Sequence, residues 1–214
     1  MYLPEHFIET DINEIKRIIK DFPLATLITS SANGLEANHL PFLVGFKNNT
    51  PQSLLGHIAI GNPIYQNNKD NEEVLVVYKA EDSYISPNWY PTKKVNHKVV
   101  PTWNYQSLHF YGKIKFLKDI KSLLKIVGKL TKIYEMQVEE SDPWTIKQAP
   151  KDFIKEKLSN IVGIQIDITK ILAKSKLNQN RDTIDFNSVK TKMLEKNKKS
   201  LHNAMSLKSN IKSN

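Results

Sequence analysis

Residues 24–46 read LATLITSSANGLEANHLPFLVGF, and this stretch decides the expected fold. Residues 24–29 are a short apolar run typical of a strand, residues 30–34 form a turn that ends in glycine, and residues 35–46 read as a returning strand. Two strands joined by so short a turn pair antiparallel. Pro41 has no backbone N–H to donate, so we expect the returning strand at a sheet edge or a bulge.

The chain around this hairpin contains further strand-like and helix-like segments. Strands are expected at 53–60, 73–79, 83–86, 99–117 and 161–168, and helices at 12–22, 119–136 and 151–160. Strands in the middle of the chain with helices at the flanks are typical of an α+β or mainly β fold.

Single residues sharpen some of these boundaries. Asp11 and Glu14 have the spacing of a capping box, and Pro23 should end the first helix. We expect Gly112 to kink the long strand and Gly163 to mark a bulge.

The composition restricts the chemistry that is open to the chain. It has 214 residues and no cysteine, so disulfides, thiolate metal sites and cysteine nucleophiles are excluded. No stretch reaches the roughly 20 apolar residues of a membrane span, and the start, MYLPEHFIETD, has acids where a secretory signal has basic and apolar residues. We therefore expect a cytoplasmic protein with no membrane partner.

The formal charge of +9 is concentrated near the C-terminus. Residues 187–214 carry seven lysines and one acid, which places +6 of the net charge there. We expect a single domain over residues 1–194 and a lysine-rich, flexible tail over residues 195–214, which either has no function or acts as an electrostatic arm.

Direct, specific binding of DNA is not expected. Only two of the 31 basic residues are arginines, Arg17 and Arg181, whereas guanine and phosphate recognition favours the arginine guanidinium. The two best helices, 12–22 and 119–136, are far apart in the sequence and do not form a helix-turn-helix. The lysine tail offers only a salt-sensitive attraction that does not depend on base sequence.

Common catalytic and metal-binding motifs are missing. The chain has no glycine-rich dinucleotide or phosphate loop, no HExxH zinc helix and no GxSxG nucleophile elbow. Its six histidines are far apart and lack the spacing of metal ligands, so we predict no metal site. The sequence identifies no catalytic residue.

Four segments combine aromatic, amide and basic residues: GHIAIGNP at 56–63, YISPNWYPTK at 84–93, VPTWNY at 100–105 and KSKLNQNR at 174–181. Trp and Tyr offer flat walls, Asn and Gln offer donors and acceptors for a heteroaromatic ring, and Ser, Thr, Lys and Arg hold phosphate. This combination would suit an aromatic, anionic ligand. The alternative is that the aromatic side chains fill a core and the prolines stiffen loops.

These segments, in this order, resemble the PaiB family. Further matches are the start MY.P.HF, HLPFLV at 39–44, PW at 143–144, AP.DF at 149–153 and IVGIQI at 161–166, so that the resemblance covers residues 1–194. The family is also described as FMN-binding negative transcriptional regulators, or as protease synthase and sporulation negative regulatory proteins.

The resemblance implies an antiparallel FMN-binding split barrel with flanking helices and FMN as the cofactor. It also implies a homodimer with flavin at the subunit interface and a role in repressing sporulation and degradative-enzyme genes. Related split barrels include oxidases, flavin reductases and heme-degrading enzymes, so the fold does not fix the activity. A flavin-dependent oxidoreductase acting on an unknown small molecule and, by fold analogy, a heme-handling protein remain alternatives, and whether the chain is an enzyme stays open.

The motifs of the resemblance imply a set of cofactor-binding residues: His57, Asn62, Tyr84, Ser86, Trp89, Tyr90, Thr92, Lys93, Trp103, Asn104, Tyr105, Lys176, Gln179, Asn180 and Arg181. The residues expected near the phosphate are Ser86, Thr92 and Lys93. Those expected to form walls for the ring are Trp89, Trp103 and Tyr105. Those expected to be polar partners of the ring or of the interface are Gln179 and Asn180.

Arg181 has two open interpretations, since it either contacts the ligand or neutralises a carboxylate such as Asp182 or Asp185. The chain also departs from the family's pattern at Ile60, where arginine is usual, and at Ala173 and Asn178, where glycine and serine are usual. Loss of an arginine that contacts phosphate would weaken flavin binding.

Overall fold

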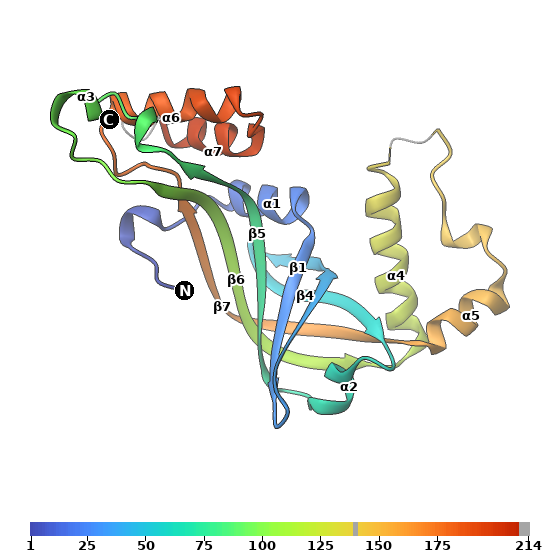
Figure 1. Cartoon of the computed structure of the whole chain (residues 1–214). Coiled ribbons are helices and arrows are strands. Elements are labelled where there is room, and N and C mark those ends of the chain that lie inside the picture. The colour runs from blue at the N-terminus through green and yellow to red at the C-terminus, as the bar shows by residue number, and fades with distance from the viewer. Residues whose placement is uncertain (139–140, 210–214) are drawn as a thin grey trace. The chain divides into compact units, whose positions relative to one another are not determined.

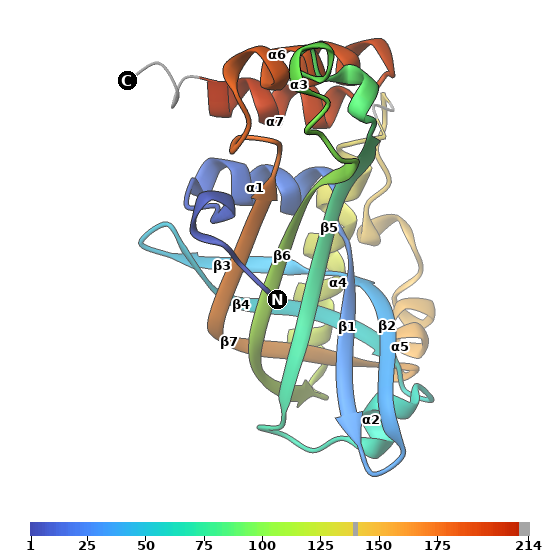
Figure 2. The same ribbon diagram turned by 60° about the vertical axis from the view of Figure 1, so that its left-hand side comes forward.

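The computed structural model describes residues 1–138 and 141–209. Seven strands form one sheet in the order β2-β1-β5-β6-β7-β4-β3 (Figures 1 and 2). The strands are β1 Leu24–Ser31, β2 Gly34–Pro41, β3 Leu43–Lys47, β4 Thr50–Ala59, β5 Glu73–Ile85, β6 Thr102–Leu117 and β7 Ile161–Lys176. The α-helices are α1 Ile12–Asp21, α2 Pro63–Asn67, α3 Lys93–Asn96, α4 Ile120–Glu135, α5 Lys151–Ser159, α6 Thr183–Glu195 and α7 Lys199–Ser209, and the short 3-10 helices are η1 Glu5–Phe7, η2 Pro87–Trp89 and η3 Ile146–Gln148.

The chain divides into two compact units. Unit 1 comprises residues 1–22, 78–109 and 172–214, and unit 2 comprises residues 23–77 and 110–171. Strands β5, β6 and β7 contribute residues to both units, because each boundary falls within one of them.

The hairpin of residues 24–46 is present, but its second strand is interrupted. β1 and β2 pair antiparallel from Leu24↔Pro41 to Ser31↔Gly34. β2 ends at Pro41, and β3 pairs with β4 instead. Between them Phe42 is buried, and a Cβ on Gly56 would lie 3.0 Å from its ring, so Gly56 gives the ring its space. The single returning strand that we expected is therefore two strands.

Two other strands are longer than their hydrophobic patterns predict. The segments expected at 73–79 and 83–86 form one strand, β5, and the late strand extends from residue 161 to residue 176 instead of ending at 168. Thr169 and Lys170 in the middle of β7 are exposed, which hides the strand period. Gly163 lies in regular register opposite His57, so the expected bulge is absent there, and the register shift between β3 and β4 falls at Gly45 and Phe46.

Helices α6 and α7 correct the prediction of a flexible tail from residue 195. They lie side by side in both views (Figures 1 and 2) and enclose a buried cluster of unit 1. The cluster consists of Ile85, Tyr90, Leu177, Phe186, Val189, Met193, Leu201, Ala204 and Met205. The helix pair is stabilised because three residues of α7 are buried in this cluster. The low-complexity composition of the segment does not reveal this burial. Residues 210–214 of the expected tail lie outside the described residues.

Several lysines of this C-terminal segment are paired with acids. Lys208 Nζ lies 2.8 Å from the buried Glu9, Lys198 lies 3.6 Å from Glu81, and Lys192 lies 2.5 Å from Glu195. Glu195 is already counted in the local charge of +6, so Glu9 and Glu81 neutralise part of that charge.

The N-terminal helix begins with Asp11 as expected, but the capping box does not close. Asp11 accepts a hydrogen bond from the backbone N–H of Asn13 at 2.8 Å. Glu14 is instead buried and accepts two hydrogen bonds of 2.8 Å from Arg17 and one of 2.6 Å from Gln106. Although burial raises the pKa of Glu14, these two partners hold it below its usual value. The helix is thus held by an ion pair whose carboxylate is buried and whose guanidinium is partly exposed.

Unit 2 has a predominantly apolar core. Helix α4 starts at the N-cap Asp119, which accepts from the backbone N–H of Ser122 at 2.9 Å, and packs against β3, β4 and α5. The buried apolar side chains include Ala25, Leu27, Leu54, Ile58, Leu123, Ile126, Leu130, Val162, Ile164 and Ile166.

No helix within residues 1–138 and 141–209 has the length and apolar character needed to cross a membrane. In the same residues, no group of three histidine, aspartate or glutamate side chains is arranged to hold a metal ion.

Candidate functional site

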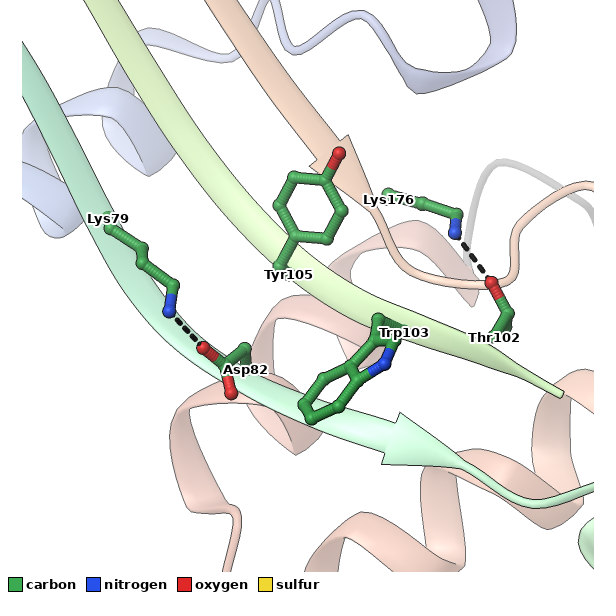
Figure 3. A pocket seen from close by; sticks show the side chains of 6 residues that line it. All are labelled: Lys79, Asp82, Thr102, Trp103, Tyr105 and Lys176. Atoms are coloured by element: carbon green, nitrogen blue, oxygen red, sulfur yellow. Dashed lines mark hydrogen bonds and ion pairs between the residues drawn. The ribbon is translucent and has the colours of Figure 1, made fainter.

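A concave surface of unit 1 brings together aromatic and basic side chains from three strands (Figure 3). It has a volume of about 720 Å³, within the range of small-molecule sites. Its lining residues are Lys79 and Asp82 from β5, Thr102, Trp103 and Tyr105 from β6, and Lys176 at the end of β7. We call this surface the aromatic–lysine concavity.

Strand alternation explains which residues of β6 reach this surface. Trp103 and Tyr105 are two positions apart and share one face of the strand, whereas Asn104 between them faces the other way. Asn104 is fully buried, and its Nδ2 lies 3.8 Å from the Met205 sulfur. Asn104, which we expected in the cofactor site, therefore lies in the core of unit 1.

The aromatic wall of the concavity is exposed to solvent. Trp103 is 52% exposed, and its ring makes an edge-to-face contact of 5.9 Å with Tyr84, which is 46% exposed. Two large aromatic side chains exposed at one place are costly unless a ligand or a partner covers them. The wall therefore offers a flat surface for stacking.

Three lysines lie at or beside the wall. Lys176 Nζ donates to Thr102 Oγ1 at 2.5 Å, and Lys79 pairs with Asp82 (Figure 3). Lys174 is buried, with its Nζ 5.3 Å from the centre of the Tyr105 ring. Burial lowers the pKa of Lys176, and the charge of Lys174 acts in the same direction.

The segment 84–93 mostly serves the structure of unit 1. Ser86 caps η2 by accepting from the Asn88 backbone N–H at 3.2 Å, and Lys93 Nζ donates to the Asn88 side chain at 2.5 Å. Thr92 donates twice to the buried carboxylate of Asp185, from its backbone N–H at 3.1 Å and from its hydroxyl at 2.7 Å. The three residues expected near a phosphate are thus engaged in local hydrogen bonds.

Two aromatic residues of this segment, Trp89 and Tyr90, face inward, whereas Tyr84 is exposed. Tyr90 is fully buried, and Trp89 packs against the same cluster. The Tyr90 hydroxyl accepts from Asn178 Nδ2 at 3.0 Å, and burial raises the pKa of Tyr90. The guanidinium of Arg181 lies 5.1 Å from the centre of the Tyr90 ring. Trp89 and Tyr90 are therefore better described as core residues than as walls of a cofactor site.

The segment after β7 is a closed turn. Gln179 donates to the Ser175 carbonyl at 2.5 Å and accepts from the Leu177 backbone N–H at 2.7 Å. Asn178 has a φ of 61°, a conformation that asparagine tolerates better than most residues, which accounts for asparagine at this departure from the family's pattern. Asn180 is exposed.

His57 and Asn62 belong to unit 2. Asn62 caps α2, accepting from Ile64 at 3.0 Å, and donates to the Asn38 side chain at 2.7 Å. His57 lines a separate cavity beside α4 and α5. The described residues that line the aromatic–lysine concavity include neither of them.

Three lining residues were not expected from the sequence. Lys79 and Asp82 were missed because nothing in the sequence links β5 to VPTWNY, and Thr102 was missed because the resemblance implies roles only for Trp103, Asn104 and Tyr105 of that motif. Thr102 could have been identified from the sequence, because it adjoins Trp103 in the same motif.

The side chains of the concavity fit a flat anion. Indole and phenol rings stack on heteroaromatic systems, and ammonium groups pair with phosphate. FMN has both parts, so this set of side chains suits it.

Comparison with known proteins agrees with this chemistry. The family model described as "Putative FMN-binding domain" matches residues 1–170. Protease synthase and sporulation protein PAI 2 of Bacillus subtilis is 34% identical over 190 residues, which is 88% of this chain and 87% of that protein.

Solved structures share the fold. A conserved hypothetical protein of Mycobacterium tuberculosis matches with a TM-score of 0.58 and 11% identity, over 85% of this chain and 94% of that one. A flavocytochrome of Azotobacter vinelandii matches with a TM-score of 0.54 and 11% identity, over 81% and 72%. The expected fold, an antiparallel split barrel with flanking helices, is confirmed, as are the PaiB resemblance and FMN as the cofactor. The chain belongs to the FMN-binding domain family that includes PAI 2.

Proposed function

We propose that the chain is an FMN-binding negative regulator of transcription whose flavin lies in the aromatic–lysine concavity, at an interface between two copies of the chain. The observation that carries the proposal is the meeting of Trp103, Tyr105 and Lys176 on one solvent-exposed surface. A solvent-exposed aromatic wall next to ammonium groups is an arrangement that suits a planar phosphate ester.

Each side chain has a defined task in this proposal. Trp103 and Tyr105 orient the ring by stacking, and Lys176, whose ammonium is already held by Thr102, binds the phosphate. Lys79 already pairs with Asp82, so it contributes less to binding of the phosphate. When bound, FMN supplies one- and two-electron redox chemistry, while the chain supplies binding and orientation.

A second copy of the chain would complete the site. Trp103 and Tyr84 expose about half of their surface in a single chain, and aromatic side chains are enriched in the cores of protein interfaces. A dimer that covers them would bury the flavin as well, so we expect flavin binding and dimerisation to stabilise one another.

Regulation by this chain is proposed to act without sequence-specific reading of DNA. The name of the relative PAI 2 refers to protease synthesis and sporulation, which supports a role in gene expression. Lys192, Lys198 and Lys208, however, are paired with acids of unit 1, which leaves less positive charge for phosphates of DNA. We expect no nanomolar, sequence-selective binding of DNA at about 150 mM salt.

The test is a titration of the full-length chain with FMN, followed by flavin fluorescence. Trp103→Ala should weaken binding at least about tenfold through lost stacking. The matched control is Trp144→Ala, which removes an exposed tryptophan of unit 2 and should leave the affinity unchanged. Equal affinities for the two variants would place the flavin elsewhere.

Sedimentation of the same samples tests the interface. The wild type should be dimeric with FMN, and Trp103→Ala should raise the dimer dissociation constant. A reporter for a repressed gene then tests regulation, since Trp103→Ala should relieve repression and Trp144→Ala should not. A chain that binds FMN as a monomer contradicts the interface without contradicting the flavin site.

A further inference from the structure

Unit 2 contains a second cavity, with a chemistry unlike that of the aromatic–lysine concavity. It has a volume of about 180 Å³ and lies between β4, α4, η3 and α5. Its walls include Val127 from α4, Ile146 from η3 and Ile154 from α5. An apolar cavity of about 150 Å³ is large enough to hold a benzene ring.

His57 gives this cavity one polar wall. Its Nδ1 is buried and has no hydrogen-bond partner within the part of the chain that the structure describes. A buried imidazole nitrogen without a partner is costly, so a ligand that bonds to it gains that lost free energy. Burial lowers the pKa of His57, which favours the neutral imidazole that can donate or accept one hydrogen bond.

Lys157 is the only charged residue among the described side chains that line the cavity. Its ammonium lies 3.4 Å from Glu156 and 5.0 Å from the centre of the Phe153 ring, and more than half of the side chain is exposed. Its methylene stem therefore borders the cavity while its charge stays in solvent. An exposed pair such as Lys157–Glu156 is weak, so the ammonium is available to an anionic group.

We infer that this cavity binds a small aromatic carboxylic acid. The ring fills the apolar space between α4, η3 and α5, the carboxylate pairs with Lys157, and a polar atom of the ligand bonds to His57 Nδ1. The three requirements of size, one buried hydrogen bond and one positive charge select this class over neutral aromatic compounds and over FMN, whose ring system is too large for the volume.

The inference does not depend on the proposed function, because its residues lie in unit 2 and those of the concavity lie in unit 1. FMN and the acid should therefore bind at the same time. If saturating FMN displaces the acid, the cavity is part of the flavin site and the inference is wrong.

The experiment titrates the full-length chain with 4-hydroxybenzoate, and with 4-hydroxybenzyl alcohol as its neutral counterpart. Calorimetry measures affinity, and nitrogen-15 NMR of the imidazole reports on His57. We expect the acid to shift the His57 Nδ1 signal and to bind about fivefold more tightly than the alcohol. No shift, or equal affinities for the acid and the alcohol, would overturn the inference.

Variants then locate the probe. Ile154→Phe fills the cavity and should weaken binding about tenfold, whereas Ile133→Phe, on a half-exposed position of α4, should not. Lys157→Gln should bind the acid about fivefold more weakly and the alcohol with unchanged affinity. Its control is Lys151→Gln, at an exposed position of the same helix. Since Ile154→Phe can disturb packing, its circular dichroism and FMN affinity must match the wild type. The site is contradicted if Ile133→Phe weakens binding as much as Ile154→Phe does, or if Lys151→Gln weakens it as much as Lys157→Gln does.

Discussion

The two units of the chain differ in how many polar side chains they bury. In unit 1, buried polar side chains such as Glu14, Gln106 and Asp185 are hydrogen-bonded to other residues of the unit, although Asn104 Oδ1 has no partner among the described residues. The lysines and aromatic rings of the concavity remain for a ligand. In unit 2 the core is predominantly apolar, and within residues 1–138 and 141–209 His57 Nδ1, from a residue that lines a small cavity, has no hydrogen-bond partner. A site of the first kind recognises charge and a flat surface, whereas one of the second kind selects by size and a single hydrogen bond.

The largest effect is expected where the polar network of unit 1 is broken. Arg17→Met leaves the carboxylate of Glu14 buried without its ion pair, which should lower the free energy of unfolding by about 3–5 kcal/mol. Urea denaturation measures the loss. Lys20→Met, an exposed change on the same helix, should stay within about 0.5 kcal/mol. A loss for Arg17→Met no larger than for Lys20→Met would show that apolar packing alone holds this unit.

The packing of α7 gives the next effect. Leu201→Ala should cost about 2–5 kcal/mol, because Leu201 is buried in the cluster of unit 1. Leu207→Ala, at a position 51% exposed on the same helix, serves as the comparison and should cost less than about 0.5 kcal/mol. If thermal unfolding gives the same midpoint for both variants, α7 is not part of the folded unit.

A smaller effect of opposite sign is expected in the concavity. Asp82→Asn removes a negative charge that competes for Lys79, so FMN affinity should rise about threefold at low salt. Asp152→Asn, in unit 2, removes the same charge from an exposed position and should leave the fluorescence titration unchanged. Weaker binding by Asp82→Asn would mean that the carboxylate itself holds the ligand.

The smallest effect concerns His57. Burial lowers its pKa in the folded chain, so the unfolded chain takes up a proton first as the pH falls below about 6.5, and stability is lost in that direction. His57→Gln should flatten the fall in the free energy of unfolding between about pH 7 and pH 5. A His57→Gln slope as steep as that of the wild type would contradict a desolvated imidazole.

The order of strands and helices was largely predictable, and its errors have local causes. Pro41 and Phe42 split a predicted strand because proline ends the ladder and the phenylalanine turns into the space over Gly56. Exposed polar residues within β7 hid its length. In the candidate site, Trp103, Tyr105 and Lys176 were identified from motifs, whereas Lys79 and Asp82 were not, because nothing in their sequence spacing links β5 to VPTWNY.

The sequence by itself determined the antiparallel hairpin, the flanking helices and membership of an FMN-binding family, because turn chemistry, hydrophobic period and ordered motifs are local properties. Only the tertiary structure decided which aromatic residues are available. Trp89 and Tyr90 turn into the core that α6 and α7 enclose, while Trp103 remains exposed. Alternation along a strand assigns residues to two faces, but which face is covered depends on segments far away in the sequence.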